Sequence, residues 1–149
     1  MHNVYFSFHY ERDAWRAAIV RNSQRFRKES TAAGRFLDAV DWEQLRRTSD
    51  TVIRRWINEQ LQNTSVTVVL IGAKTSTRHW VRYEIEQSIK LGKGLLGVRI
   101  HAIKDSSGSS DLEGLNPLAS RYQVYDWFPD NGYANLGKWI EDAARAAGR

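Results

Sequence analysis

A carboxylate and an indole lie four residues apart, at Glu84 and Trp80, within the segment Ser76-Thr77-Arg78-His79-Trp80-Val81-Arg82-Tyr83-Glu84-Ile85. Residues four apart share one face of a helix, so the two side chains are expected to point the same way. A carboxylate in such a setting can stabilise the positive charge that develops at an anomeric carbon when a glycosidic bond breaks. Glu84 is therefore our candidate catalytic residue, although most helix glutamates have no such role and Trp80 could equally be a core aromatic.

The residues around this pair predict how it is positioned. Residues 66–71 are apolar without alternation, as in a parallel strand covered on both faces. A short loop follows, and Val81, Ile85 and Ile89 then recur at helical spacing, which predicts a helix over residues 77–91. In open α/β sheets, ligands bind beyond the carboxyl ends of the strands, so Glu84 is expected on a ligand-binding rim. His9 follows the first predicted strand and would share this rim, but an ordinary half-buried loop histidine explains it as well.

The first third of the chain predicts a strand, a helix and a weaker strand. Residues 3–8 are β-branched and aromatic, and residues 36–40 form a second, less marked strand. Between them we expect a helix capped by Asp13, followed by a polar loop over residues 24–35. The apolar face of this helix is predicted to carry Trp15, Ala18, Ile19 and Asn22.

The remaining elements continue the alternation. A helix is predicted over residues 50–61, with Ser49 or Asp50 as its cap. A strand is predicted over 95–100 and an edge strand over 122–126. A last helix is predicted over 133–147, and its buried residues are expected to be Leu136, Trp139, Ile140, Ala143 and Ala147. Residues 104–120 form a long polar connection that we expect to be mobile. The pattern predicts one domain over residues 1–149, an α/β flavodoxin-like three-layer sandwich with a mostly parallel five-stranded sheet.

Composition limits the function classes. The formal net charge is +5, from 22 Lys and Arg against 17 Asp and Glu, but the basic residues are scattered, so we expect no nucleic-acid partner. No apolar run is long enough to span a membrane and the first residues do not resemble a signal peptide, which favours a cytoplasmic protein. With no cysteine and four unclustered histidines, we expect no metal site.

The string Gly92-Lys93-Gly94-Leu95-Leu96-Gly97 matches the dinucleotide-binding pattern G-x-G-x-x-G. In that fold the glycines follow a strand and open a helix. Here they follow the helix predicted over 77–91 and lead into a strand. We therefore interpret Gly92 and Gly94 as helix-terminating residues and reject the dinucleotide-binding interpretation.

Two segments resemble the TIR-like proteins of bacterial anti-phage defence, notably those named ThsB in Thoeris systems. The first is Val4-Tyr5-Phe6-Ser7-Phe8-His9-Tyr10-Glu11 with the following Asp13-x-Trp15-Arg16 and Val20-Arg21-Asn22-Ser23. The second is Ser76-x-x-x-Trp80-x-x-x-Glu84-Ile85, which is similar to the TIR helix that carries the catalytic glutamate. Val81 departs from the usual pattern, in which cysteine follows the tryptophan. The segment before the helix at 50–61 also lacks the loop through which TIR domains assemble.

The resemblance implies an enzyme that consumes NAD as a substrate and needs no further cofactor. It would break the nicotinamide–ribose bond and hydrolyse or cyclise the product, a messenger that activates a separate effector protein. Glu84 then matches the catalytic glutamate, and the substrate-binding candidates are Phe8, His9, Tyr10, Arg16, Asn22, Ser76 and Trp80. The resemblance also implies self-association to complete the site and a phage-derived trigger. Two alternatives stay open, a non-enzymatic TIR-like adaptor and a deoxyribosyltransferase-like enzyme acting on another N-glycoside.

Overall fold

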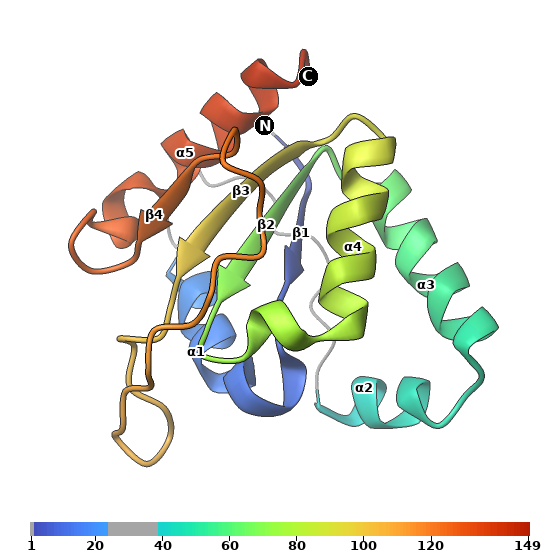
Figure 1. The fold of residues 1–149 in the computed structure, drawn as a ribbon, viewed down its shortest axis with the longest axis horizontal. Coiled ribbons are helices and arrows are strands. Elements are labelled where there is room, and N and C mark those ends of the chain that lie inside the picture. The colour runs from blue at the N-terminus through green and yellow to red at the C-terminus, as the bar shows by residue number, and fades with distance from the viewer. Residues whose placement is uncertain (1, 24–38) are drawn as a thin grey trace.

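A computed structural model describes residues 2–23 and 39–149 of the chain (Figure 1). At its centre, four parallel strands pair in the order β1-β2-β3-β4. Their bounds are Val4–Ser7, Val66–Ile71, Gly94–Arg99 and Val124–Asp126. Every residue of β1 and β2 is buried, so these strands lie inside the molecule with both faces covered.

Helices cover both faces of the sheet. On one face, α1 (Tyr10–Asn22) and α5 (Gly132–Ala146) contribute to the largest apolar cluster together with residues of the central strands. On the other, α3 (Asp50–Gln62) packs against β1 and α4 (His79–Lys90) packs against β2 and β3. The short helix α2 (Ala39–Arg46) precedes α3, and a single 3₁₀ turn, η1 (Thr75–Thr77), precedes α4. Figure 1 shows this three-layer α/β arrangement, which confirms the predicted flavodoxin-like class.

Several predicted elements are confirmed closely. The helix α3 begins after Ser49, whose hydroxyl accepts a hydrogen bond from the backbone N–H of Val52. The strand β2 has the predicted bounds, and α5 buries Leu136, Trp139 and Ile140 as expected. Its last turn differs slightly, because Ala144 is buried, Ala143 only partly so, and Ala147 is exposed.

The predicted second strand is wrong where it can be compared. Residues 36–38 lie outside the described residues, and Ala39 and Val40 belong to α2 rather than to a strand. The residues of α2 are mostly good helix formers, with Ala, Leu, Glu, Gln and Arg among the eight, and local propensity therefore outweighed the short apolar run. The described part of the sheet has four strands where we predicted five.

The apolar face predicted for the first helix is also wrong. Asp13 is not the cap but a buried residue inside α1, and the cap is His9, whose ring accepts from the backbone N–H of Arg12 at 3.3 Å. Trp15 and Ile19 are 54% and 37% exposed, whereas Asp13, Arg16, Ala17 and Val20 face the interior. The buried face of α1 thus carries an ion pair, which a hydropathy pattern cannot recognise.

Gly92 and Gly94 behave as predicted from their place between helix and strand. Gly92 comes two residues after the end of α4. Its φ is +67°, a conformation that glycine adopts without strain. A Cβ on Gly94 would lie 2.9 Å from the backbone of Ala143, so this glycine lets α5 approach the start of β3. Neither residue opens a helix, in agreement with our rejection of a dinucleotide-binding motif.

The connection from β3 to β4 is anchored at several points, where we expected a mobile loop. Arg12 forms a two-point pair with Asp111, with N···O distances of 2.6 and 2.9 Å. A Cβ on Gly114 would lie only 2.2 Å from the carbonyl oxygen of Gly72, so this part of the connection packs directly on the end of β2. The connection therefore buttresses the turn that leads to α4.

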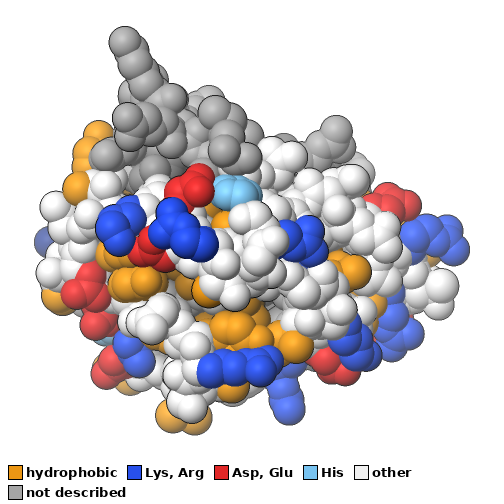
Figure 2. Space-filling model, turned by 90° about the horizontal axis from the view of Figure 1, so that it is seen from above, with side chains coloured by type: hydrophobic (Ala, Val, Ile, Leu, Met, Phe, Trp, Pro, Cys, Tyr) orange, Lys and Arg blue, Asp and Glu red, His pale blue; other side chains and the backbone are white. Residues whose placement is uncertain are grey.

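Two surface properties bear on partners. On the face seen in Figure 2, Lys and Arg side chains are interspersed with Asp and Glu and form no single basic patch. Within residues 2–23 and 39–149, no helix is long and apolar enough to cross a membrane.

Candidate functional site

Glu84 lies on the side of α4 that faces β1. Val81 and Ile85 of the same helix pack into the apolar cluster against the sheet, which fixes the rotation of α4 and directs Glu84 inward. Tyr5 and Ser7 alternate along β1 and so project from one face of the strand. The Tyr5 hydroxyl donates to Glu84 Oε2, and the Ser7 hydroxyl donates to Oε1 at 2.7 Å.

Burial controls the ionisation of Glu84, which is only 7% exposed. Burial raises the pKa of Glu84 to about 7, while the hydroxyls of Tyr5 and Ser7 and the charge of Lys93 act in the opposite direction. Glu84 is thus present in both the protonated and the ionised form near neutral pH. An ionised carboxylate has about four acceptor positions, so two remain for a ligand after Tyr5 and Ser7 are bound.

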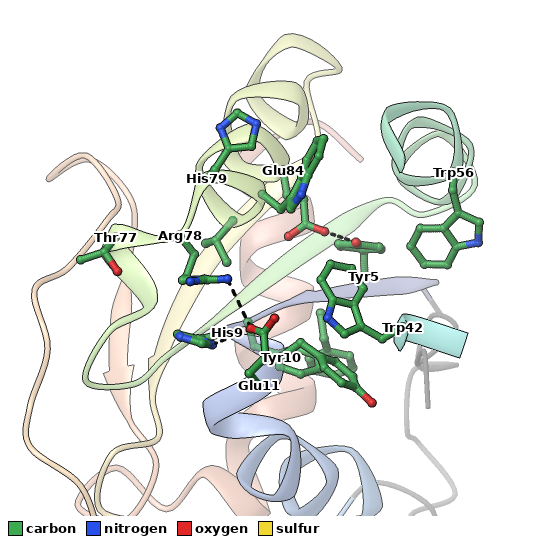
Figure 3. A pocket seen from close by; sticks show the side chains of 14 residues that line it. Tyr5, His9, Tyr10, Glu11, Trp42, Trp56, Thr77, Arg78, His79 and Glu84 are labelled. Carbon is green, nitrogen blue, oxygen red and sulfur yellow. Dashed lines mark hydrogen bonds and ion pairs between the residues drawn. The ribbon is translucent and has the colours of Figure 1, made fainter. Parts of the chain in front are cut away.

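A pocket of about 340 Å³ opens beside Glu84 at the carboxyl ends of β1 and β2 (Figure 3). Its wall is mostly aromatic, and helices α1, α2, α3 and α4 all contribute to it. The lining residues are Tyr5, Phe6, Phe8, His9, Tyr10, Glu11, Trp42, Trp56, Thr77, Arg78, His79, Trp80, Val81 and Glu84.

The aromatic rings form two groups around this pocket. Tyr10 lies between Phe8 and Trp42, with centroid distances of 5.9 and 5.3 Å. Trp80 packs edge-on against Tyr83 on the α4 side, with centroids 5.6 Å apart. Flat π-surfaces on several sides suit a planar ring as ligand, and they also attract a cation.

Charged groups line the rim of the pocket near the start of α1 (Figure 3). Glu11 pairs with Arg78 at 3.3 Å and with Arg46 at 3.4 Å. Burial would raise the pKa of Glu11, but its backbone hydrogen bond and Arg78 outweigh burial and lower it, so Glu11 is ionised. Burial and the charge of Arg78 lower the pKa of His9, whose imidazole is therefore neutral at pH 7.

The structure brings together five of the eight residues that we predicted for the site. Phe8, His9, Tyr10, Trp80 and Glu84 all line the pocket. Ser76 lies in η1 one residue before the lining residue Thr77 and does not itself line the pocket.

The other two predicted residues lie elsewhere on α1. Arg16 is 2% exposed and faces the β3–β4 connection, where it donates to the carbonyl oxygens of Ile103 at 2.6 Å and Ser109 at 2.9 Å. Asn22 ends α1, twelve residues beyond Tyr10, which at 1.5 Å per residue is about 18 Å along the helix. Neither residue lines the pocket, so the site has to be described without them.

Sequence reasoning missed the two hydroxyl partners of Glu84 and most of the aromatic wall. Tyr5 and Ser7 carried a usable signal, because two polar groups on one face of an otherwise apolar buried strand need partners. Trp56 was predicted only as part of the helix over residues 50–61, and Trp42 was not considered. No pattern in the sequence indicated that Arg78 and Glu11 line the pocket.

The described residues contain no group of three or more His, Cys, Asp or Glu side chains placed to hold a metal ion.

Comparisons with known proteins agree with this geometry. Residues 5–105 match the family described as "Thoeris protein ThsB, TIR-like domain". The chain is also 35% identical, over an alignment of 188 positions, to the protein of Bacillus cereus (strain MSX-D12) named "Putative cyclic ADP-D-ribose synthase ThsB1". That alignment covers 92% of this chain and 97% of the relative. The matched family segment contains β1 from Tyr5 onward, all of α4 and every residue that lines the pocket.

Proposed function

Because this chain belongs to the ThsB family of TIR-like proteins, we propose that it consumes NAD, breaks the nicotinamide–ribose bond and forms a cyclic ADP-ribose product. The observation that carries the proposal is Glu84, a buried carboxylate held by two hydroxyls at the floor of an aromatic pocket. The name of the relative, a cyclic ADP-D-ribose synthase, supports the same reaction. The product would activate a separate effector protein.

Cleavage of the nicotinamide–ribose bond needs no general acid. Nicotinamide in NAD is a pyridinium cation, and it leaves as a neutral molecule when the electron pair of the C1′–N bond moves to its nitrogen. The ribose C1′ then carries positive charge, which the ionised Glu84 stabilises from the floor of the pocket. Water or another part of the same ADP-ribose attacks C1′ and loses its proton, which gives the open or the cyclic product.

The ionised form of Glu84 is the active one in this scheme. Since burial raises its pKa to about 7, we expect turnover to increase as the pH rises through about 7. The hydroxyls of Tyr5 and Ser7 hold the carboxylate oxygens in place, so the stabilising charge needs no reorganisation during the reaction.

The aromatic wall supports binding of the nicotinamide end. A pyridinium ring is both planar and cationic, and both properties favour contact with Trp80, Trp42 or Tyr10. A volume of about 340 Å³ is at the lower end for ligand pockets, so we assign the pocket to the nicotinamide riboside half. The rest of the dinucleotide would extend past the rim, where self-association of two chains would complete the site.

Arg78 is the group that we expect to meet the pyrophosphate. Its pair with Glu11 is partly exposed, and such pairs contribute little free energy, so a phosphate can replace Glu11 easily. The guanidinium also matches phosphate geometry better than an ammonium would.

The test is mass spectrometry of products after incubation of concentrated protein with NAD, with and without a phage lysate as trigger. We expect free nicotinamide and a cyclic product from the wild type and none from Glu84→Gln. The matched control is Glu86→Gln, which removes an exposed glutamate on the same helix and should retain full activity. Absence of nicotinamide at every concentration, with and without the lysate, would contradict the proposal and favour the adaptor. Cleavage of other N-glycosides in preference to NAD would favour the deoxyribosyltransferase-like alternative.

A further inference from the structure

Lys93 is a buried lysine that packs over the ring of Tyr5 and does not itself line the pocket. It lies between α4 and β3, and it is only 4% exposed. Its ammonium donates to the Thr64 hydroxyl at 2.6 Å and lies 5.7 Å from the centre of the Tyr5 ring. Lysine side chains are rarely buried without a paired charge, so the position of Lys93 requires an explanation.

Tyr5 connects this lysine to Glu84. The face of its ring receives the ammonium, and its hydroxyl donates to the Glu84 carboxylate. The cation therefore holds the ring from one side, while the carboxylate holds the hydroxyl at the other end. Positive charge behind the ring also strengthens the phenol as a hydrogen-bond donor, because it polarises the O–H group.

We propose that Lys93 is a positioning residue, which acts through Tyr5 to keep Glu84 ionised and in place. Lys93 does not line the pocket, whereas Tyr5, whose ring its ammonium approaches, does. The inference deepens the proposed function and rests on it wherever turnover is the measurement.

Charge reciprocity between the two groups supports this inference. Burial raises the pKa of Glu84 and lowers the pKa of Lys93, in each case to about 7. The charge of each partner opposes that shift, so Glu84 and Lys93 favour each other's charged form. Removing the ammonium leaves the burial effect on Glu84 less opposed, and the pKa of Glu84 must rise further.

The other charged and polar groups that face this unit come from three parts of the chain, the C-terminus, β1 and the turn after α3. Arg149 at the C-terminus also lowers the pKa of Lys93, and its guanidinium donates to the carbonyl oxygens of Leu91 and Gly92. Tyr5 and Ser7 of β1 face Glu84, and Thr64, after α3, faces Lys93. Glu84 is the one carboxylate among the groups that shift the pKa of Lys93.

The direct test is a carboxyl titration by ¹³C NMR of protein labelled at its glutamates, with Glu84→Gln used to assign the signal. In Lys93→Met, which keeps the length and apolar stem of the side chain, we expect the pKa of Glu84 to rise by about one unit. Lys93→Arg retains the charge and should restore most of the wild-type titration. Lys90→Met is the matched control, because it removes an exposed lysine from the end of α4 and should shift nothing.

Turnover gives the second measurement. In Lys93→Met the rising limb of kcat against pH should move to higher pH, with about a fivefold loss at pH 7 that is recovered near pH 9. KM should change little, because Lys93 does not line the pocket. A merely structural role would lower the rate equally at every pH.

Two outcomes separate this inference from the proposed function. A folded Lys93→Met protein with an unchanged Glu84 titration would overturn the role of Lys93, whatever the enzyme does with NAD. If the wild type releases no nicotinamide but the pKa of Glu84 is still higher in Lys93→Met than in the wild type, the proposed function is overturned and the Glu84–Lys93 coupling is supported. If Lys93→Met does not fold, Thr64→Val keeps the lysine but removes its hydroxyl acceptor, and it should shift Glu84 in the same direction. An unshifted titration in a folded Thr64→Val protein would then overturn the inference.

Discussion

In the part of the chain that the structure describes, two carboxylates are buried, Glu84 on α4 and Asp13 on α1, and they lie on opposite faces of the sheet. Burial raises the pKa of each. Glu84 is held by neutral hydroxyls and faces a cavity. Asp13 is held by the Arg16 guanidinium at 3.1 Å, and its other side is closed by the backbone of Gly72.

The difference indicates how the carboxylate that we propose as catalytic is distinguished from one with a structural role. Arg16 neutralises Asp13 and uses its remaining donors on the loop carbonyls of Ile103 and Ser109, so this pair connects α1 to the β3–β4 connection. Among residues 2–23 and 39–149, no comparable cation contacts Glu84, and two of its acceptor positions remain after Tyr5 and Ser7 are bound. Free space and weak neutralisation, rather than burial, therefore distinguish the carboxylate that we propose as catalytic.

The largest expected effect comes from removing the charge at Glu84. Glu84→Gln should reduce nicotinamide release by about a thousandfold or more, because the stabilising charge at C1′ is lost. Its melting temperature should be no lower than that of the wild type. Asp13→Asn should do the opposite, with a lower melting temperature and a rate that falls only with the folded fraction. If Glu84→Gln and Asp13→Asn lost rate and melting temperature to the same extent, the proposed difference between the two carboxylates would be wrong.

Next in size is the loss of Arg16. Arg16→Met leaves Asp13 buried without its cation, and it should lower the free energy of unfolding by about 3–5 kcal/mol. Chemical denaturation measures this change. Arg12→Met breaks the more exposed pair with Asp111 and should cost less than about 1 kcal/mol. KM for NAD should stay unchanged in folded Arg16→Met, and a rise in KM would assign Arg16 to substrate binding after all.

The pH dependence of stability gives a smaller effect. Because the folded state raises the pKa of Glu84 from 4.5 to about 7, it binds a proton that the unfolded chain has released between these values. The wild type should therefore lose stability relative to Glu84→Gln as the pH rises from 5 to 7, by no more than about 3 kcal/mol. Denaturant titrations at pH 5, 6 and 7 measure this difference. A constant difference would show that the folded environment leaves the pKa of Glu84 unshifted.

The smallest expected effect concerns Gly72, whose backbone packs against the Asp13 carboxylate. A Cβ on Gly72 would lie 2.2 Å from Asp13 Oδ2, so Gly72→Ala should destabilise the protein by about 1–3 kcal/mol. Gly137→Ala on α5 is the control, because no atom lies within 4 Å of its added Cβ. In that helix, alanine should stabilise by about 0.5–1 kcal/mol, so the two glycine variants should have opposite signs. Thermal melts are sufficient to compare them.

Much of the fold followed from local patterns in the sequence. The buried strand β2 and the capped helix α3 were predicted because their apolar pattern agrees with their burial. The stripe predicted on α4 is confirmed at Val81 and Ile85, which are buried, and wrong at Ile89, which is 40% exposed. The first helix failed for a clear reason, since polar Asp13 and Arg16 are buried while apolar Trp15 and Ile19 are exposed. Periodicity reports burial only where polarity and burial coincide.

The site was predicted in part. Glu84 and Trp80 come from one local segment, so a single sequence could suggest them. The contact of Tyr5 with Glu84 spans 79 residues of chain and that of Ser7 spans 77, and no local pattern encodes a pairing at such separations. In the folded sheet β1 pairs with β2, with Val4 opposite Val66 and Ser7 opposite Val69, and this pairing of distant segments cannot be derived from local sequence.

The anchored β3–β4 connection also has a practical consequence for protein engineering. From composition alone, the whole polar stretch looks like a suitable place for an inserted tag or reporter domain. Only its tip is suitable, around Gly108, which has φ at +82° and no neighbour within 4 Å of an added Cβ. An insertion near Gly114, which rests on the carbonyl of Gly72, would displace the turn that precedes the helix carrying Glu84. A reporter at the tip would therefore leave the pocket intact, whereas one a few residues later would inactivate the protein it was meant to report on.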